Sequence, residues 1–367
     1  MNVRILEGDA LAVLRTLADE SVNCCVTSPC YWGLRDYGVP GQMGLEKTPE
    51  EFVERLVAVF REVRRVLRDD GTIWVNLGDS YAASTKGSGG HNPKQDSNAG
   101  SWHDSRRWKI PGGLKQKDLV GIPWRVAFAL QADGWWLRSD IIWHKPNPMP
   151  ESVTDRPTKA HEYLFLLAKS ARYYYDAKAI AEPCKLDTPR RYERGRSDHH
   201  KNADGGPGNQ TICKTLEHMR RRSSGNVTRK LANGTDSRLN THMGSSVPWT
   251  DTGEGRNRRT VWTVSTKPFK GAHFATFPPK LIEPCILAGC PPGGVVLDPF
   301  CGSGTTGMVA RQHGRNFVGI ELNPDYAVMA RARAAYPHVP AEITRHRTGI
   351  QSYGMSGDYG ARSHKQK

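Results

Sequence analysis

The sequence predicts an α/β fold built on an open, mostly parallel sheet with helices on both faces. Short apolar runs alternate with amphipathic stretches along much of the 367 residues, as in consecutive strand–helix units. A glycine loop follows the apolar run 295–297, and a polar and aromatic segment, residues 27–33, follows the run 22–26. Because open α/β sheets bind ligands beyond the carboxyl ends of their strands, we expect both segments at one functional edge.

Strands are expected at the short apolar runs, and helices where apolar residues recur every three or four positions. The expected strands are residues 3–6, 22–26, 72–77, 135–143, 163–168, 261–264, 295–297 and 316–320. The expected helices are residues 10–17, 49–68, 123–132, 279–288, 305–313 and 324–335. The helix at 49–68 has the clearest start, because Thr48 can cap it and Pro49 and two acids follow.

Composition and charge limit the class of protein. The first 17 residues lack the basic start and apolar core of a signal peptide, and no window is apolar for long enough to cross a bilayer. We therefore expect a soluble, intracellular protein. The eight cysteines include no CxxC pair and no zinc-type spacing, so we interpret them as reduced thiols and expect no metal site. The net charge of +15 and the pI near 9.5 favour a polyanionic partner, although basic balance can also serve solubility alone.

Two long segments lack apolar periodicity. Residues 81–117 are rich in Gly, Ser, Asn and His and are expected to form a mobile loop, whose aromatic and basic residues at 102–109 either contact nucleic acid or face solvent. Residues 185–260 contain 16 Lys and Arg against 8 Asp and Glu, about half of the net charge. We therefore expect a catalytic domain in two parts, 1–184 and 261–340, with a basic insertion at 185–260 and a flexible basic tail at 341–367.

The segment 27–33 contains groups that suit a planar ring with an amino group. Ser28 offers a hydroxyl, the carbonyl of Pro29 is an acceptor, and Tyr31 and Trp32 offer flat faces. On its own, the segment can equally be a strand-to-loop turn with two packing aromatics.

The glycine loop at 298–307 favours an adenosyl group over a phosphate. No lysine follows its last glycine, as a phosphate loop requires, and the GxGxxG spacing is only partly met. Glu321 ends the next expected strand about 20 residues later, where an acid can accept hydrogen bonds from ribose hydroxyls. Asp9 lies between a strand and a helix, where it either caps the helix or accepts a hydrogen bond from a ligand amino group.

Together these motifs resemble those of the DNA amino-methyltransferases. Residues 298–306, with the sequence DPFCGSGTT, resemble the S-adenosylmethionine loop of that family, and residues 28–31, SPCY, resemble its four-residue catalytic motif. The catalytic motif comes first and the basic insertion lies between the two, which is the order of the β class. The likeness extends over nearly the whole chain, including 142–147 and 266–276. It implies a Rossmann-like, mixed, mostly parallel seven-stranded sheet, with S-adenosylmethionine as the cofactor.

The resemblance also implies roles for individual residues. Ser28, Pro29 and Tyr31 match the target-base site, and Asp9 matches the acid that contacts adenine. The residues that match the rest of the cofactor site are Lys267, His273, Phe274, Thr276, Asp298, Phe300, Gly302, Gly304, Thr305 and Glu321. The insertion matches the target-recognition region, and the basic residues expected to contact duplex DNA there, unless they only face solvent, are Arg220, Arg221, Arg222, Arg256, Arg258 and Arg259.

The motif suits methylation of an exocyclic amino group. Hydrogen bonds from the two N–H groups to Ser28 Oγ and the Pro29 carbonyl would free the nitrogen lone pair, and Tyr31 would stack on a base flipped from the duplex. Members of the resembled family with Ser in the first position mostly act on cytosine N4, and those with Asp or Asn mostly on adenine N6. We therefore expect cytosine N4, with adenine N6 as the alternative. The family usually has proline at the position of Cys30, and often Ser or Ala at that of Cys301.

Three other functions are weighed against this one. A C5-cytosine methyltransferase with Cys30 as nucleophile would have the reverse motif order and a Glu-Asn-Val stretch, which this chain lacks. The others are a non-catalytic basic DNA-binding protein and a methyltransferase of RNA or protein, since a fold alone does not define a substrate. The expected partners are duplex DNA and, from the resemblance, a homodimer and a cognate restriction enzyme. The resemblance also implies a cytoplasmic, nucleoid-associated enzyme of bacterial or phage type.

Overall fold

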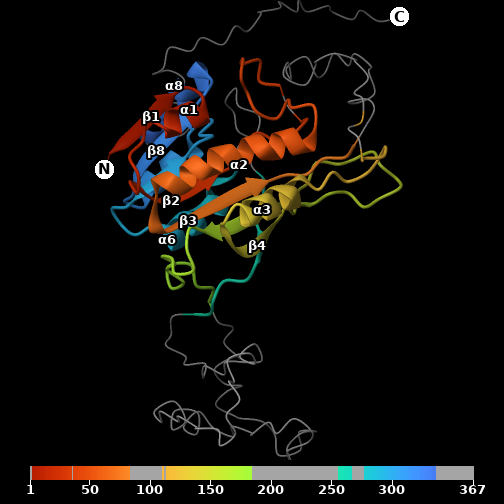
Figure 1. Cartoon of the computed structure of the whole chain (residues 1–367). Helices are drawn as coiled ribbons and strands as arrows, with labels where there is room; N and C mark the ends of the chain where they lie inside the picture. The colour runs from red at the N-terminus through yellow and green to blue at the C-terminus, as the bar shows by residue number, and fades with distance from the viewer. Residues whose placement is uncertain are drawn as a thin grey trace, which may run out of the picture. The chain divides into compact units, whose positions relative to one another are not determined.

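The computed structural model describes residues 2–34, 36–82, 110, 113–183, 255–266 and 277–335. Its strands are β1 (Val3–Glu7), β2 (Val22–Thr27), β3 (Leu67–Leu77), β4 (Trp136–His144), β5 (His161–Ala168), β6 (Val261–Thr263), β7 (Val295–Asp298) and β8 (Asn316–Glu321). Its helices are α1 (Ala10–Leu14), α2 (Pro49–Val66), α3 (Ile122–Ala132), α6 (Pro279–Gly289), α7 (Thr305–Gln312) and α8 (Pro324–Ala335). Figure 1 shows them coloured along the chain.

The strands form one mixed sheet in the order β1-β8-β7-β2-β3-β5-β4-β6. The first five in this order run parallel, β5 is antiparallel to both β3 and β4, and β6 is parallel to β4. The expected mostly parallel sheet is confirmed, but eight strands are present in the described residues and not seven. The eight strands correspond to the eight runs expected from the sequence pattern, whereas the family resemblance implied seven, and β6 is a three-residue edge strand that pairs with the end of β4.

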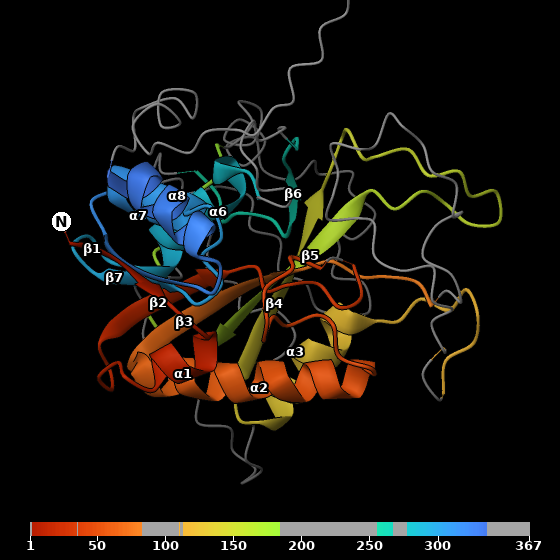
Figure 2. The ribbon, with the colours of Figure 1, turned by 90° about the horizontal axis from the view of Figure 1, so that it is seen from above.

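Helices cover both faces of the sheet. Figure 2 shows α1, α2 and α3 on one face and α6, α7 and α8 on the other. The apolar stripe of α2 includes Phe52, Leu56 and Phe60, all fully buried, so this helix is fixed by the largest part of the core. Its first turn is capped as expected, because Thr48 Oγ1 accepts a hydrogen bond from the Glu51 amide at 3.1 Å.

Most element boundaries lie within two residues of the expected ones, but the end of α1 and the start of β3 differ by more. Helix α1 ends at Leu14 and not at residue 17, since Thr16 turns back and its hydroxyl donates to the Val13 carbonyl at 2.8 Å. Helix α2 ends at Val66, and β3 begins directly at Leu67 instead of at residue 72. The early start of β3 is accommodated by a register shift between Val22 and Cys24 of β2.

The order of the strands reverses between β2 and β7. These two strands pair in parallel, Cys24 with Val296 and Cys25 with Leu297. From β2 the chain continues through α2 to β3 on one side, and from β7 it continues through α7 to β8 on the other. The loops after β2 and β7 therefore diverge at a topological switch point, where open α/β sheets form their ligand crevice.

The chain separates into two units, residues 1–176 with 259–367, and residues 177–258. The sheet belongs to the first. In the second, Glu182 and Arg256 pair through two backbone hydrogen bonds of 2.9 and 2.8 Å. Most of the expected insertion 185–260, most of the expected loop 81–117 and the expected tail lie outside the described residues, so these boundaries stay predictions. Within the described part of the chain, no helix is long and apolar enough to span a membrane.

Candidate active site

A cavity of about 930 Å³ opens beyond the carboxyl ends of the parallel strands. The loops after β1, β2, β7 and β8 line it on one side, and the start of β5 and the segment after β4 line it on the other. Residues 28–31 and the glycine loop both contribute to its wall. The two motifs, which are far apart in sequence, are thus brought together at one site, as the sequence predicted.

Asp298 joins the strands that carry the two motifs. Its Oδ1 accepts hydrogen bonds from Thr27 Oγ1 at 2.6 Å and from the Phe300 amide at 3.1 Å, and its Oδ2 accepts one from Thr306 Oγ1 at 2.6 Å. The residue is 1% exposed, and burial raises the pKa of its carboxyl group to about 6. Asp298 lines the cavity as expected, but its hydrogen bonds position the glycine loop from within the protein.

Two glycines of the loop have different roles. Gly302 lines the cavity, and its positive φ of 52° suits a residue without a side chain. Gly304 is not among the lining residues, although the resemblance implies a cofactor contact for it. A Cβ at this position would lie 2.7 Å from Ala330 Cα, so Gly304 allows α8 to pack directly on the loop. From the same helix, Arg333 donates to the Ser303 carbonyl at 2.8 Å and holds the loop in place.

Glu321 is positioned to hold a diol. Its Oε2 accepts a hydrogen bond from the Gly302 amide at 2.7 Å, and its Oε1 accepts one from the Asn323 amide at 2.9 Å. Burial raises the pKa of this carboxyl group. Each oxygen has a further lone pair, and the residue lines the cavity. The carboxylate of Glu321 is thus fixed by backbone amides in a cavity that Phe300 also lines, and the glycine loop has no lysine for a phosphate. This combination fits an adenosyl group.

Asp9 caps α1, one of the two roles considered for it. Its Oδ1 accepts a hydrogen bond from the Ala12 amide at 2.9 Å. It also lines the cavity, so a contact with the adenine ring is compatible with the cap and stays a prediction. Phe300 and Thr305 line the same cavity, as the resemblance implies.

The target-base side of the cavity is built on a buried asparagine, Asn76. Asn76 Oδ1 accepts hydrogen bonds from Tyr31 Oη at 3.2 Å and, at the long limit of 3.5 Å, from Ser28 Oγ. Its Nδ2 donates to Glu162 Oε2 at 3.2 Å and to the Tyr163 carbonyl at 3.1 Å. All four hydrogen-bonding positions of this amide are used, which fixes the Ser28 hydroxyl and the Tyr31 ring relative to the sheet.

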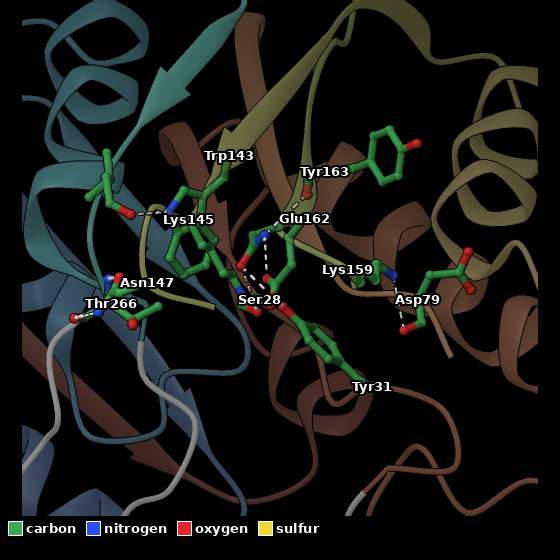
Figure 3. A network of polar contacts seen from close by, with 12 residues as sticks. Ser28, Tyr31, Asp79, Trp143, Lys145, Asn147, Lys159, Glu162, Tyr163 and Thr266 are labelled. Atoms are coloured by element: carbon green, nitrogen blue, oxygen red, sulfur yellow. Dashed lines mark hydrogen bonds and ion pairs between the residues drawn. The ribbon is translucent and has the colours of Figure 1, made fainter. Parts of the chain in front are cut away.

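Glu162 links this network to a lysine. Its Oε2 lies 2.6 Å from Tyr31 Oη, the shorter of the two contacts between which that hydroxyl shares its single hydrogen (Figure 3), and its Oε1 forms an ion pair with Lys145. The side chains of the pair are only 14% and 19% exposed, and the lysine Nζ also lies 4.5 Å from the centre of the Trp143 ring. The sequence analysis missed Asn76 and Glu162. An asparagine within an otherwise apolar strand is the signal that could have indicated the first.

The structure separates the two aromatic residues of the motif. Trp32 does not face the ligand, because it is 6% exposed and its Nε1 donates to the Glu46 carbonyl at 3.0 Å. The ring of Tyr31 lies so close to Gly78 that a Cβ on this glycine would be 2.4 Å from the ring.

The hydroxyl of Tyr31 and the thiol of Cys30 have raised pKa values. Burial and the adjacent Glu162 raise the pKa of Tyr31, and burial raises the pKa of the Cys30 thiol to about 12. Both groups therefore stay protonated near neutral pH.

Several expected site residues cannot be placed. Lys267, His273, Phe274, Thr276, Arg220, Arg221 and Arg222 lie outside the described residues. Arg256 forms an ion pair with Glu182 at 3.1 Å within the second unit. Arg258 is partly exposed and Arg259 is exposed, and the carbonyl of Arg259 accepts a hydrogen bond from Trp262 Nε1 at 2.7 Å. A DNA contact by any of these arginines stays a prediction.

The sheet order, the acid-anchored glycine loop and the Ser-Pro-Cys-Tyr segment beside it define a DNA amino-methyltransferase of the β class. A family model described as DNA methylase matches residues 22–332, and the chain belongs to this family of S-adenosylmethionine-dependent enzymes.

Individual relatives agree with the family match. The chain is 48% identical over 326 residues to the type II methyltransferase M.Cfr9I of Citrobacter freundii, covering 89% of this chain and 85% of the relative. Among solved structures it is similar to PvuII DNA methyltransferase (cytosine-N4-specific), with a TM-score of 0.55, 17% identity and coverage of 95% and 92%. It is also similar to the S-adenosyl-L-methionine complex of TTHA0409 from Thermus thermophilus, with a TM-score of 0.51, 22% identity and coverage of 91% and 94%. These two structures share the fold.

The buried Asp298 predicts an unusual dependence of stability on pH. Its folded-state pKa of about 6 lies above the ordinary value of 3.8, so the fold favours the protonated acid. This contribution is full below about pH 4 and is lost as the pH rises through about 6. Asp298→Asn cannot ionise, and its amide can use the same hydroxyl partners. Between pH 4.5 and 7.5 the free energy of unfolding of the variant should therefore rise by about 2 kcal/mol relative to wild type, as measured by urea denaturation.

The exposed Asp70, whose side chain is 56% accessible, provides the control. Asp70→Asn should leave the difference from wild type nearly constant with pH. A difference for Asp298→Asn that is equally constant would contradict the assignment of a raised pKa to Asp298.

Proposed function

We propose that this protein transfers a methyl group from S-adenosylmethionine to the exocyclic N4 of a cytosine flipped out of duplex DNA. The observation that carries the proposal is that residues 28–31 and the loop anchored by Glu321 open into one cavity. Family membership supplies the coarser class, a DNA methyltransferase. Ser28 in the first motif position supports cytosine N4, and adenine N6 is the alternative at the same site.

The Ser28 hydroxyl can accept a hydrogen bond from an amino group of the target base. When this hydroxyl donates to Asn76 Oδ1, 3.5 Å away, Ser28 Oγ has lone pairs available to a donor in the cavity. The carbonyl of Pro29 is a second acceptor on the same wall. An exocyclic amino group has two N–H donors and a lone pair delocalised into the ring. Holding both N–H groups with these acceptors favours a pyramidal nitrogen, which makes its lone pair available for attack.

Tyr31 supplies a fixed face for the flipped base. Its hydroxyl bonds to Asn76 and Glu162, and the missing side chain of Gly78 lets the ring lie close to the sheet. A ring held in this way loses little further freedom when a base stacks on it, so that stacking can offset part of the cost of unpairing. Glu162 acts through Tyr31 and is therefore a positioning residue.

The other wall of the cavity is suited to the methyl donor. Glu321 would accept hydrogen bonds from the ribose hydroxyls, and Asp9 and Phe300 would adjoin the adenine. When bound, S-adenosylmethionine supplies a methyl group activated by the positive sulfur. The base nitrogen gains this methyl group and loses one proton. No covalent bond to the enzyme is required, in agreement with a Cys30 thiol that stays neutral.

Duplex DNA is the substrate that the charge supports. The chain has a net charge of +15, which favours a polyanionic partner. Within the cavity wall, Lys145 is paired with Glu162, and Lys159 donates to the Asp79 carbonyl at 3.1 Å (Figure 3). Burial lowers the pKa of Lys159. A homodimer and a cognate restriction enzyme stay predictions from the family resemblance.

The identity of the product is the direct test. DNA from a methylase-free host that expresses this chain should contain N4-methylcytosine when it is digested to nucleosides and measured by mass spectrometry. Sequencing of the same DNA for modified bases gives the recognition sequence. N6-methyladenine as the sole product would select the alternative base, 5-methylcytosine would restore Cys30 as a nucleophile, and no modified base would refute the proposed activity.

Glu321→Gln is expected to weaken cofactor binding. The glutamine side chain would place its NH2 group against the backbone N–H of Gly302 or of Asn323. It would also lose the negative charge that favours hydrogen bonds from the ribose hydroxyls. We expect the dissociation constant for S-adenosylmethionine to rise by about tenfold or more, as measured by titration calorimetry. Glu7→Gln is the matched control, because Glu7 pairs in register with Glu321 but forms a surface ion pair with Arg331. Equal affinity in both variants would refute the role of Glu321.

Substitutions at Tyr31 separate stacking from positioning. Tyr31→Ala removes the ring, and kcat/KM on DNA should fall by about 10- to 100-fold, the usual value of one stacked base. Tyr31→Phe keeps the ring but loses the 2.6 Å hydrogen bond to Glu162, so a smaller loss is expected. If Glu162 acts through Tyr31, the double variant Tyr31→Phe with Glu162→Gln should be less impaired than the two single effects combined. Fully additive effects would mean that Glu162 acts independently of Tyr31.

A further inference from the structure

One exposed methionine lies at the rim of the cavity, on the connection between β4 and β5. Figure 2 shows that this connection extends well beyond the ends of the two strands. Met149 is 86% exposed, the highest value for a large apolar residue in the described part of the chain. It lines the cavity together with Asn147 and Pro148. An apolar side chain with both properties is unfavourably hydrated until a partner covers it.

The backbone that carries Met149 is held rigidly. Pro146, Pro148 and Pro150 alternate around it, and each proline fixes its own φ and restricts the residue before it. The side chain of Asn147 makes two reciprocal hydrogen bonds with the backbone of Thr266, at 3.1 and 3.0 Å (Figure 3). The methionine is therefore two residues from a fixed anchor that belongs to a distant part of the chain.

The far side of the connection is fixed as well. Glu151 forms an ion pair with Arg156 at 2.5 Å, and the guanidinium group of Arg156 stacks over the ring of Tyr81 at 3.8 Å from its centre. At the base of the connection, the Lys145 amide donates to the Ala160 carbonyl at 2.8 Å. With both arms anchored, little ordering entropy is lost when the tip inserts into a partner.

The surroundings of Met149 favour duplex DNA as that partner. The next exposed apolar residue on the connection, Val153, is 36% exposed and does not line the cavity, so Met149 is the residue of this connection that combines high exposure with a place at the rim. The net charge of the chain, +15, and its membership of the DNA methylases both favour nucleic acid at this rim. A protein partner would require a larger apolar area.

We propose that Met149 is a wedge that enters the base stack of the duplex where the target base leaves it. The proposal rests on the proposed function, since a base must be flipped for a gap to form. A vacated position exposes two apolar base faces, and proteins fill or open such steps with Met, Leu, Ile, Phe or Pro side chains. The unbranched, polarizable thioether can adapt to that gap, and the rigid connection sets where it enters.

The test compares paired and mispaired targets. Two duplexes contain the recognition sequence found by sequencing, with the target base either in its normal pair or opposite a mismatched base, which is already partly unstacked. Met149→Ala should lower kcat/KM on the paired duplex by about tenfold or more, and on the mispaired duplex by no more than about threefold. Met149→Leu should stay close to wild type on both, and Val153→Ala, on the same connection, is the matched control.

A second readout does not depend on methyl transfer. With 2-aminopurine in place of the target base, the increase in fluorescence on binding reports unstacking, and it should be smaller for Met149→Ala than for wild type or Val153→Ala. An equal loss on both duplexes, or wild-type behaviour of Met149→Ala in both assays, would overturn the wedge while the methyltransferase stands. If wild type methylates neither duplex, the proposed function falls and the wedge falls with it.

Discussion

The parallel pairing of β2 with β7 is the constraint on which the whole site depends. Only two register pairs, Cys24 with Val296 and Cys25 with Leu297, join these strands, and the chain leaves them in opposite directions. Beyond the last pair, Asp298 continues the connection by accepting hydrogen bonds from Thr27 on one strand and from Thr306 at the start of α7. The raised pKa of Asp298 is a consequence of this arrangement, because an acid that joins three elements from inside the core must give up its hydration.

The two walls of the cavity are supported by different means. On the cofactor wall, backbone groups do most of the positioning, since Glu321 is held by two amides and Gly304 lets α8 pack against the loop. On the target wall, side chains do it, through Asn76, Glu162 and Lys145. Removing one partner of the buried ion pair would leave the other charged and poorly hydrated, a costly change. The geometry of the cofactor wall therefore depends mainly on the path of the backbone. The geometry of the target wall depends mainly on which side chains are present.

Local patterns in the sequence were sufficient for the strands, the motifs and their meeting at one edge, because each follows from periodicity and from strand order. Long-range contacts were not predictable in the same way. Trp32 and its aromatic neighbour look equivalent in sequence, and only the position of the Glu46 carbonyl turns the tryptophan inward. Asn76 meets Glu162 because β3 and β5 run antiparallel, which brings together residues 86 positions apart. Gly304 resembles a ligand-binding glycine in sequence, but its neighbour is a helix.

The backbone of the catalytic motif is held by neighbouring segments, which is compatible with a cysteine, Cys30, at the position where the resembled family usually has proline. A proline there would restrict the backbone by its ring. In this chain the segment is held from outside, because the Gly33 amide donates to the Gly44 carbonyl at 2.8 Å and the Gly44 amide donates to Glu46 Oε2 at 2.8 Å. A Cβ on Gly44 would lie 2.9 Å from the Tyr31 carbonyl, so the two segments pack without a gap. The acceptors before Cys30 are thus supported without a proline, and its partly buried thiol, with a pKa of about 12, remains too protonated to attack a base.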